Sequence, residues 1–218
     1  MRLQSVIFDM DGTLLDSMPT WRELGPTFLK EAGITATPEQ DRMLHILADC
    51  DVIPYLREVC GLPWSQQEII DQIIQRMETF YSSQVRPKPG LEKFLSILKM
   101  EGVWMYVATA THRRLTEKAL KTAGIDHYFR GIVTSADAGN HKSESADIYE
   151  MAMRRLQSNK RDTVVFEDAL HAIRTAKAAG FRVAGVYEAT AEQDQPEIQR
   201  LCDYYIRSYE ELVQSETF

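Results

Sequence analysis

Acidic, basic and hydroxyl side chains follow the short apolar runs of this 218-residue chain, at the points where the runs end. They are Asp9 and Asp11 after residues 6–8, Thr109 after 104–108, Lys142 beyond 132–133, and Glu167 and Asp168 after 164–166. Four carboxylates cannot share a small volume while ionised unless a positive charge holds them, because like charges raise one another's pKa. Ligand atoms that are all oxygen favour Mg²⁺ over zinc or copper. The set therefore predicts a magnesium site.

The same set contains what a phosphate group needs. Lys142 supplies positive charge and Thr109 supplies a hydroxyl donor, while the backbone amides around Gly12 and Thr13 add further donors at fixed positions. Gly12 also suits a backbone that turns sharply and approaches a ligand closely. We therefore expect a phosphate to bind beside the cation.

The apolar runs alternate with helical patterns, which is typical of βαβ units and of a parallel sheet with helices on both faces. Strands are expected at residues 5–8, 104–108, 132–133, 164–166 and 183–186, and helices at 91–100, 114–123, 146–156 and 169–179. In such sheets ligands bind beyond the carboxyl ends of the strands, where the polar residues above are expected. The predicted fold class is α/β, with a Rossmann-like parallel sheet as the core.

Residues 17–85 interrupt this alternation, because they contain several helical signals and no convincing strand. Ser17 is expected to cap a first helix, and Thr37 and Ser65 each open a capping-box pattern. An inserted all-helical cap domain is the predicted structure of this region. The predicted domains are a catalytic core, residues 1–16 and 86–218, and a helical cap, residues 17–85.

Composition narrows the possible partners. The 25 basic and 32 acidic residues give a net charge of −7, and no basic tract is present that would follow a nucleic-acid backbone. No long uncharged apolar run is present, and Asp9 and Asp11 fall where a signal peptide needs its apolar segment. We expect a soluble cytoplasmic protein that binds neither nucleic acid nor membrane and is a monomer.

The segment FDMDGTLLDS at residues 8–17 resembles the first motif of the haloacid dehalogenase superfamily of phosphohydrolases. The later order is similar too, with Thr109 after a strand, Lys142 before a helix, and Glu167 and Asp168 after another strand. The helical insert resembles the small cap of the phosphoglycolate phosphatase and β-phosphoglucomutase branch. The resemblance covers nearly the whole chain.

The resemblance implies a role for each matching residue. Asp9 is expected to be the nucleophile that becomes an aspartyl phosphate, and Asp11 the acid and base that serves the leaving group and the water. Thr109 and Lys142 are expected to hold the phosphoryl oxygens, with Gly12 at the phosphate loop. The implied Mg²⁺ ligands are Asp9, the backbone carbonyl of Asp11, Asp168 and Glu167.

Other residues are candidates for contact with the substrate. Thr111 resembles a serine of the mutase-like members and is expected to touch phosphate. His112 and Arg113 begin a helix near the site, and Arg42 and His45 lie in the insert. We expect these last four residues to influence substrate specificity.

The function implied is a Mg²⁺-dependent phosphatase that hydrolyses a small phosphomonoester, such as a sugar or polyol phosphate, through an aspartyl phosphate. The alternative is a mutase of sugar phosphates similar to β-phosphoglucomutase. Ile46 and Asp49 stand where those mutases carry a glycine and a phosphate-binding arginine, which argues against that enzyme itself.

Two classes of non-enzymatic protein share part of this pattern. A receiver-type signalling module combines Asp, Thr and Lys at strand ends, but it carries its acceptor on a middle strand, whereas Asp9 follows the first strand. A catalytically silent binding member of the family is disfavoured because every charged catalytic position is filled.

Overall fold

The parallel sheet is the element on which the site is built. The structure, a computed structural model, describes residues 3–46 and 49–214, and the side chains of residues 45, 46, 49 and 50 lie outside the described part. Its six strands are β1 (Ser5–Phe8), β2 (Trp104–Thr109), β3 (Ile132–Thr134), β4 (Thr163–Glu167), β5 (Arg182–Val186) and β6 (Tyr204–Ile206). They run parallel in the order β3-β2-β1-β4-β5-β6. The α/β fold class and the five predicted strands are confirmed.

The register of the central strands brings their carboxyl ends to one level. Phe8 pairs with Val107 of β2 on one side and with Phe166 of β4 on the other. Asp9, which follows Phe8, is therefore level with the last residues of both neighbours. Every residue of β1 and β4 is buried, as expected for strands covered on both faces.

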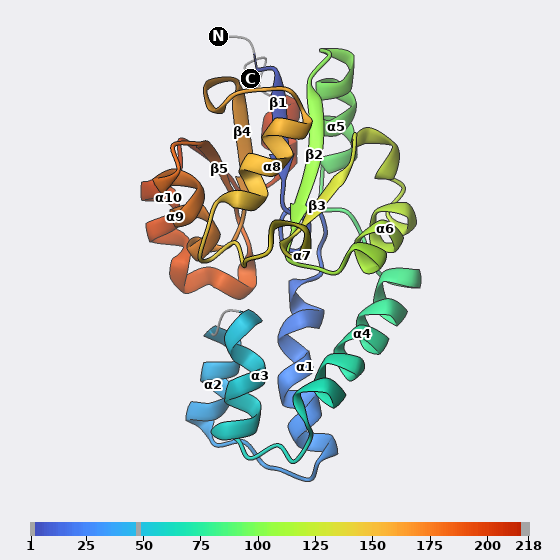
Figure 1. The fold of residues 1–218 in the computed structure, drawn as a ribbon, viewed down its shortest axis with the longest axis vertical. Helices are drawn as coiled ribbons and strands as arrows, with labels where there is room; N and C mark the ends of the chain where they lie inside the picture. The colour runs from blue at the N-terminus through green and yellow to red at the C-terminus, as the bar shows by residue number, and fades with distance from the viewer. Residues whose placement is uncertain (1–2, 47–48, 215–218) are drawn as a thin grey trace.

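Helices cover both faces of the sheet (Figure 1). One face packs against α5 (Leu91–Met100), α6 (Arg113–Thr122) and α11 (Tyr209–Gln214), and the other against α8 (Asp147–Arg155), α9 (Leu170–Ala178) and α10 (Gln195–Leu201). Shorter elements are α7 (Ser135–Ala138) and the 3-10 turns η1 (Asp126–Tyr128), η2 (Lys160–Asp162) and η3 (Ala189–Asp194). The four helices expected in this part are confirmed to within a residue or two, whereas β6, α7, α10 and α11 were not predicted.

Four consecutive helices separate β1 from the rest of the core, as expected for the insert. They are α1 (Met18–Glu31), α2 (Pro38–Ile46), α3 (Asp49–Glu58) and α4 (Gln66–Ser83). In Figure 1 they lie below the carboxyl edge of the sheet. Thr37 and Ser65 form the predicted capping boxes. Ser17 stands at the N-cap of α1, but the prediction that its side chain caps the helix is wrong. Its backbone is helical rather than extended, its oxygen accepts no cap hydrogen bond, and its hydroxyl donates to Asp11.

The two chain crossings between sheet and helical insert lie side by side. Leu15 and Pro87 form an antiparallel bridge, the amide of Asp16 donates to the carbonyl of Arg86 at 3.0 Å, and the amide of Lys88 donates to the carbonyl of Leu14 at 2.9 Å. The predicted boundaries at residues 16 and 86 fall at this bridge. The division into core and cap domains stays a prediction.

Among the described helices, none combines the length and the apolar character needed to cross a lipid bilayer.

An aromatic cluster supports the centre of the sheet and gives a test of the fold. The Phe94 ring of α5 packs against Phe8, Phe166 and Tyr209, with centroids 6.5, 5.7 and 5.5 Å away. We expect Phe94→Ala to lower the free energy of unfolding by ~3–5 kcal/mol, because it leaves a cavity among these rings. Met100, at the end of the same helix, is 79% exposed, so Met100→Ala should change the free energy of unfolding by less than ~0.5 kcal/mol. Urea unfolding followed by circular dichroism measures both.

Candidate active site

Three buried carboxylates meet at the carboxyl edge of the sheet. Asp9 follows β1, Glu167 ends β4 and Asp168 comes next, and one oxygen from each lies within 4.8 Å of the others. Lys142 reaches them from the turn between α7 and α8, before a helix as expected. Its Nζ lies 2.8 Å from Asp9 Oδ1 and 2.6 Å from Glu167 Oε1. The structure thus brings together four of the residues predicted to form the site.

The cluster contains three acidic groups and one basic group, and this imbalance shifts their pKa values. Burial, and then the charge of Glu167, raises the pKa of Asp9 well above its usual value and that of Asp168 to about 7. Burial opposes ionisation of Glu167 as well, but the charge and hydrogen bond of Lys142 outweigh it, and the pKa of Glu167 is lowered. Burial would lower the pKa of Lys142, yet the three carboxylates raise it. One ammonium group therefore compensates three acids incompletely.

Neighbouring donors hold two of these carboxylates in place. The Tyr149 hydroxyl donates to Glu167 Oε1 at 2.8 Å, and the amides of Asp168 and Ala169 donate to Oε2 at 3.0 and 3.1 Å. The Thr13 hydroxyl donates to Asp168 Oδ1 at 2.8 Å. Each carboxylate is thus oriented by neighbours that leave it facing the others.

Gly12 lies directly against Asp168. Its φ is +78°, a conformation that L side chains rarely adopt, and a Cβ atom there would lie 2.3 Å from Asp168 Oδ2. Glycine at this position therefore leaves room for the carboxylate. The phosphate-binding role expected for Gly12 stays a prediction.

The donor set fits a magnesium ion. The cluster of Asp9, Glu167 and Asp168 offers carboxylate oxygens alone, and burial together with mutual repulsion leaves it in need of positive charge. The carboxylate of Asp11 is not part of this described cluster, and its predicted contribution is that of its backbone carbonyl.

Asp11 points its carboxylate toward three hydroxyl groups. The Ser17 and Tyr81 hydroxyls donate to Oδ1 at 2.6 and 2.5 Å, and the Thr111 hydroxyl donates to Oδ2 at 2.7 Å. The amide of Thr111 donates to Thr109 Oγ1 at 3.1 Å. Thr111 therefore links Asp11 to Thr109, and its expected contact with phosphate stays a prediction.

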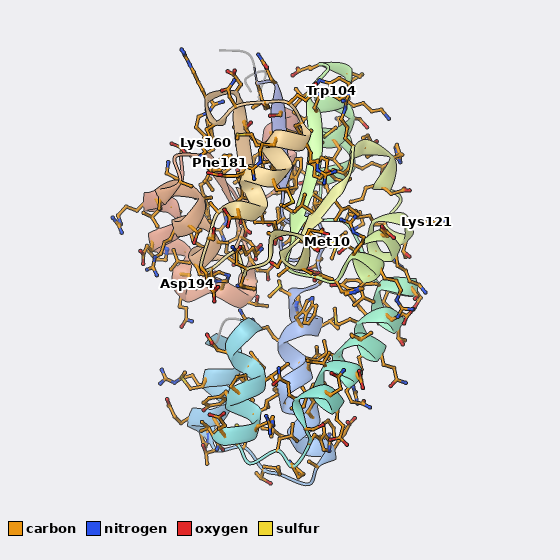
Figure 2. All side chains as sticks on the ribbon, viewed as in Figure 1. Met10, Trp104, Lys121, Lys160, Phe181 and Asp194 are labelled. Carbon is orange, nitrogen blue, oxygen red and sulfur yellow. The ribbon has the colours of Figure 1, made fainter. Side chains whose placement is uncertain are left out.

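A cavity of about 290 Å³ opens on these side chains. It is lined by the predicted residues Asp9, Asp11, Thr109, Thr111, Lys142 and Asp168. Residues not predicted to contribute also line it: Met18, Arg22, His171, Arg174, Thr190 and Asp194. Figure 2 places Asp194 at the edge of the core that faces the helical insert. The cavity thus extends from the acidic cluster to the space between core and insert.

The predicted specificity residues lie elsewhere where the structure describes them. Arg42 is exposed and paired with Glu39 at 2.7 Å. Arg113 is paired with Asp137 at 2.7 Å, and His112 is the exposed N-cap of α6. None of the three is among the described residues that line the cavity. The side chain of His45 lies outside the described residues. The roles of all four stay predictions.

The positions of several unpredicted cavity residues could have been predicted from the order of strands in the sequence. His171 and Arg174 are on the first two turns of α9, directly after Glu167 and Asp168, and Thr190 lies in η3 beyond β5. Loops and helix starts that follow the strands of a parallel sheet border the ligand site. The rule predicts His171 and Arg174 from the end of β4 and Thr190 from the end of β5.

The sheet and its acidic edge define the class of an α/β phosphohydrolase. Residues 6–186 match the model of the haloacid dehalogenase-like hydrolase family, and the chain belongs to that family. The resemblance found in the first motif is thus confirmed.

Individual relatives agree with this assignment. A phosphorylated carbohydrates phosphatase of Thermotoga maritima is 26% identical over 185 residues, which cover 84% of this chain and 85% of that protein. Hexitol phosphatase B of Escherichia coli is 24% identical over 217 residues, 97% and 95% of the two chains. A mutant CbbY from Rhodobacter sphaeroides, solved in complex with xylulose-(1,5)bisphosphate, has a TM-score of 0.79 at 22% identity and covers 96% of each chain. The chain is a phosphoric monoester hydrolase of this family.

The raised pKa values predict a link between pH, metal and stability. Asp9 and Asp168 keep protons in the folded protein that the unfolded chain has lost, the pKa of Asp168 being about 7. Binding these protons stabilises the folded protein. The stabilisation is complete at a pH below the pKa of the unfolded chain, and it is lost as the pH rises through the pKa of the folded protein. In EDTA, the Tm of the wild type should therefore fall between about pH 5 and pH 8 more steeply than that of Asp168→Asn.

Mg²⁺ should raise the Tm of the wild type at about pH 8 and much less at about pH 5, because protons compete with the metal for the carboxylates. Differential scanning fluorimetry measures both effects. Equal pH dependence of wild type and Asp168→Asn, or no effect of Mg²⁺ at the higher pH, contradicts the assignment of these groups.

Proposed function

We propose that this protein hydrolyses a small sugar or polyol phosphate through an aspartyl phosphate on Asp9, with Mg²⁺ as cofactor. The observation that carries the proposal is the position of Asp9, which is buried beside two other carboxylates with the Lys142 ammonium 2.8 Å from its Oδ1. A phosphate drawn to Lys142 lies within reach of the Asp9 carboxylate.

The proposed reaction has two steps on the same two aspartates. An oxygen of Asp9 attacks phosphorus, the bond from phosphorus to the ester oxygen breaks, and Asp11 gives its proton to the leaving alkoxide. Water then attacks phosphorus while Asp11 takes one of its protons, and the bond to Asp9 breaks. Inorganic phosphate leaves and both aspartates return to their first state.

Charge stabilisation accounts for much of the rate in such transfers. Lys142 and Thr109 bind the phosphoryl oxygens in this proposal, and both line the cavity beside Asp9. Asp9, the Asp11 carbonyl, Glu167 and Asp168 would hold Mg²⁺, which supplies further positive charge to the phosphoryl group.

The far end of the cavity suits a leaving group that carries hydroxyls. Arg174 pairs there with Glu197 at 2.8 Å, and Asp194 adds an acceptor. Thr190 Oγ1 is buried and has no hydrogen-bond partner among the described residues. Mixed donors and acceptors match a polyol, and the names of two relatives, a phosphorylated carbohydrates phosphatase and a hexitol phosphatase, support this substrate class.

Asp9→Asn tests the chemistry. With Mg²⁺ and a panel of sugar and polyol phosphates, the wild type should release phosphate and Asp9→Asn should lose more than ~1,000-fold in kcat, because the amide is a poor nucleophile. Asp16→Asn is the matched control, since this exposed residue of the same segment should keep full activity. Equal inactivity of wild type and Asp9→Asn across the panel contradicts the proposal, and conversion of glucose 1-phosphate into its 6-phosphate supports the mutase instead.

Thr190→Val tests the leaving-group end. Replacing the hydroxyl with a methyl group removes a donor and acceptor at nearly constant volume, so we expect kcat/KM for the preferred polyol phosphate to fall ~5-fold. The value for phenyl phosphate, which has no hydroxyl to bind, should stay within ~2-fold. A parallel loss for both esters contradicts a hydroxyl-binding role for Thr190.

A further inference from the structure

A hydrogen-bonded chain runs from the helical insert to Asp11. Trp21 of α1 donates its indole N–H to the Tyr81 hydroxyl of α4 at 3.0 Å, and that hydroxyl bonds to Asp11 Oδ1 at 2.5 Å. An indole nitrogen can only donate, so the tyrosine oxygen accepts from Trp21 and its single proton points at Asp11. The indole of Trp21 thus determines the direction of both hydrogen bonds.

Tyr81 is placed to keep this arrangement. Its side chain is fully buried, and burial together with the charge of Asp11 raises its pKa well above the usual value, so the hydroxyl stays protonated. One turn earlier on α4, Glu78 pairs with Arg114 and Lys118 of α6, at 2.8 and 3.7 Å. These ion pairs attach to the core the same helix that carries Tyr81.

We propose that Tyr81 is a positioning residue for Asp11, through which the seating of the helical insert on the core sets the place of the proton donor. This inference rests on the proposed role of Asp11 as acid and base. The hydroxyls of Tyr81 in α4 and of Ser17, the residue before α1, both donate to Oδ1 of Asp11. Thr111 of the core donates to Oδ2. Without the Tyr81 hydroxyl, the carboxylate loses its link to α4, and its rotation is held by Ser17 and Thr111 with one hydrogen bond fewer.

The test compares two substrates that differ in their need for a proton. A polyol phosphate releases an alkoxide that Asp11 must protonate, whereas 4-nitrophenyl phosphate releases a stable phenolate without protonation. The parameter kcat/KM reports the steps up to formation of the aspartyl phosphate. We expect Tyr81→Phe to lower kcat/KM ~10–100-fold for the polyol phosphate and less than ~3-fold for the nitrophenyl ester.

Tyr128→Phe is the matched control. Its hydroxyl also pairs with a side chain, Ser96 at 2.7 Å, but that pair joins α5 and η1 away from the cavity. This variant should leave both kcat/KM values unchanged. Thermal unfolding of each variant measures the cost of the lost hydrogen bond independently of activity.

The possible outcomes separate the two proposals. If Tyr81→Phe lowers kcat/KM equally for both esters, or for neither, the positioning role is wrong while the proposed function stands. If the wild type hydrolyses neither ester, the proposed function itself fails. Should Tyr81→Phe not fold, Trp21→Phe removes the donor that directs the hydroxyl, and an unchanged ratio between the two esters in that variant contradicts the inference.

Discussion

The excess of buried negative charge over positive charge is the constraint on which the site depends. Lys142 approaches Asp9 and Glu167 within 2.8 Å and satisfies Glu167, whose pKa is lowered. Asp9 and Asp168 remain under the repulsion of their neighbour and hold raised pKa values. Such a cluster is costly to bury alone and gains stability from any positive group that enters it. The adjacent ends of the parallel strands β1 and β4 make this concentration of charge possible, because they bring Asp9, Glu167 and Asp168 to one level.

The fold was predictable from local pattern to a large extent. Strand β1 is a short apolar run bounded by polar residues, and helix α5 ends before Gly102, so both have the predicted limits. Strand β6 and helix α10 escaped prediction because their segments, near Tyr204 and Ile198, are short and carry no clear period. The acidic residues of the site were predictable as well, since parallel topology requires strand ends to meet.

The rest of the site depends on tertiary contacts that no local pattern encodes. Tyr81 lies 70 residues from Asp11 along the chain, and its role depends on how α4 packs beside α6. Tyr149 looks like an ordinary buried residue of α8 until packing places its hydroxyl on Glu167. Ser17 has the sequence of a helix cap, yet its backbone is helical rather than extended, and its hydroxyl donates to the carboxylate of Asp11, a charged acceptor that forms a strong hydrogen bond.

The paired crossings at Leu15 and Pro87 have a consequence for how such an enzyme diversifies. Backbone hydrogen bonds hold the two ends of the insert together. The insert is therefore joined to the core at the same two points whatever lies between them. The entropy of closing that loop is largely set at its base and grows only slowly with loop length. Helices of the insert can therefore be lengthened, exchanged or resculpted without disturbing the strand register beneath them. Such changes leave the site intact only where Tyr81 and Ser17 keep their hydrogen bonds to Asp11, so the insert is freer to vary far from the core than beside it.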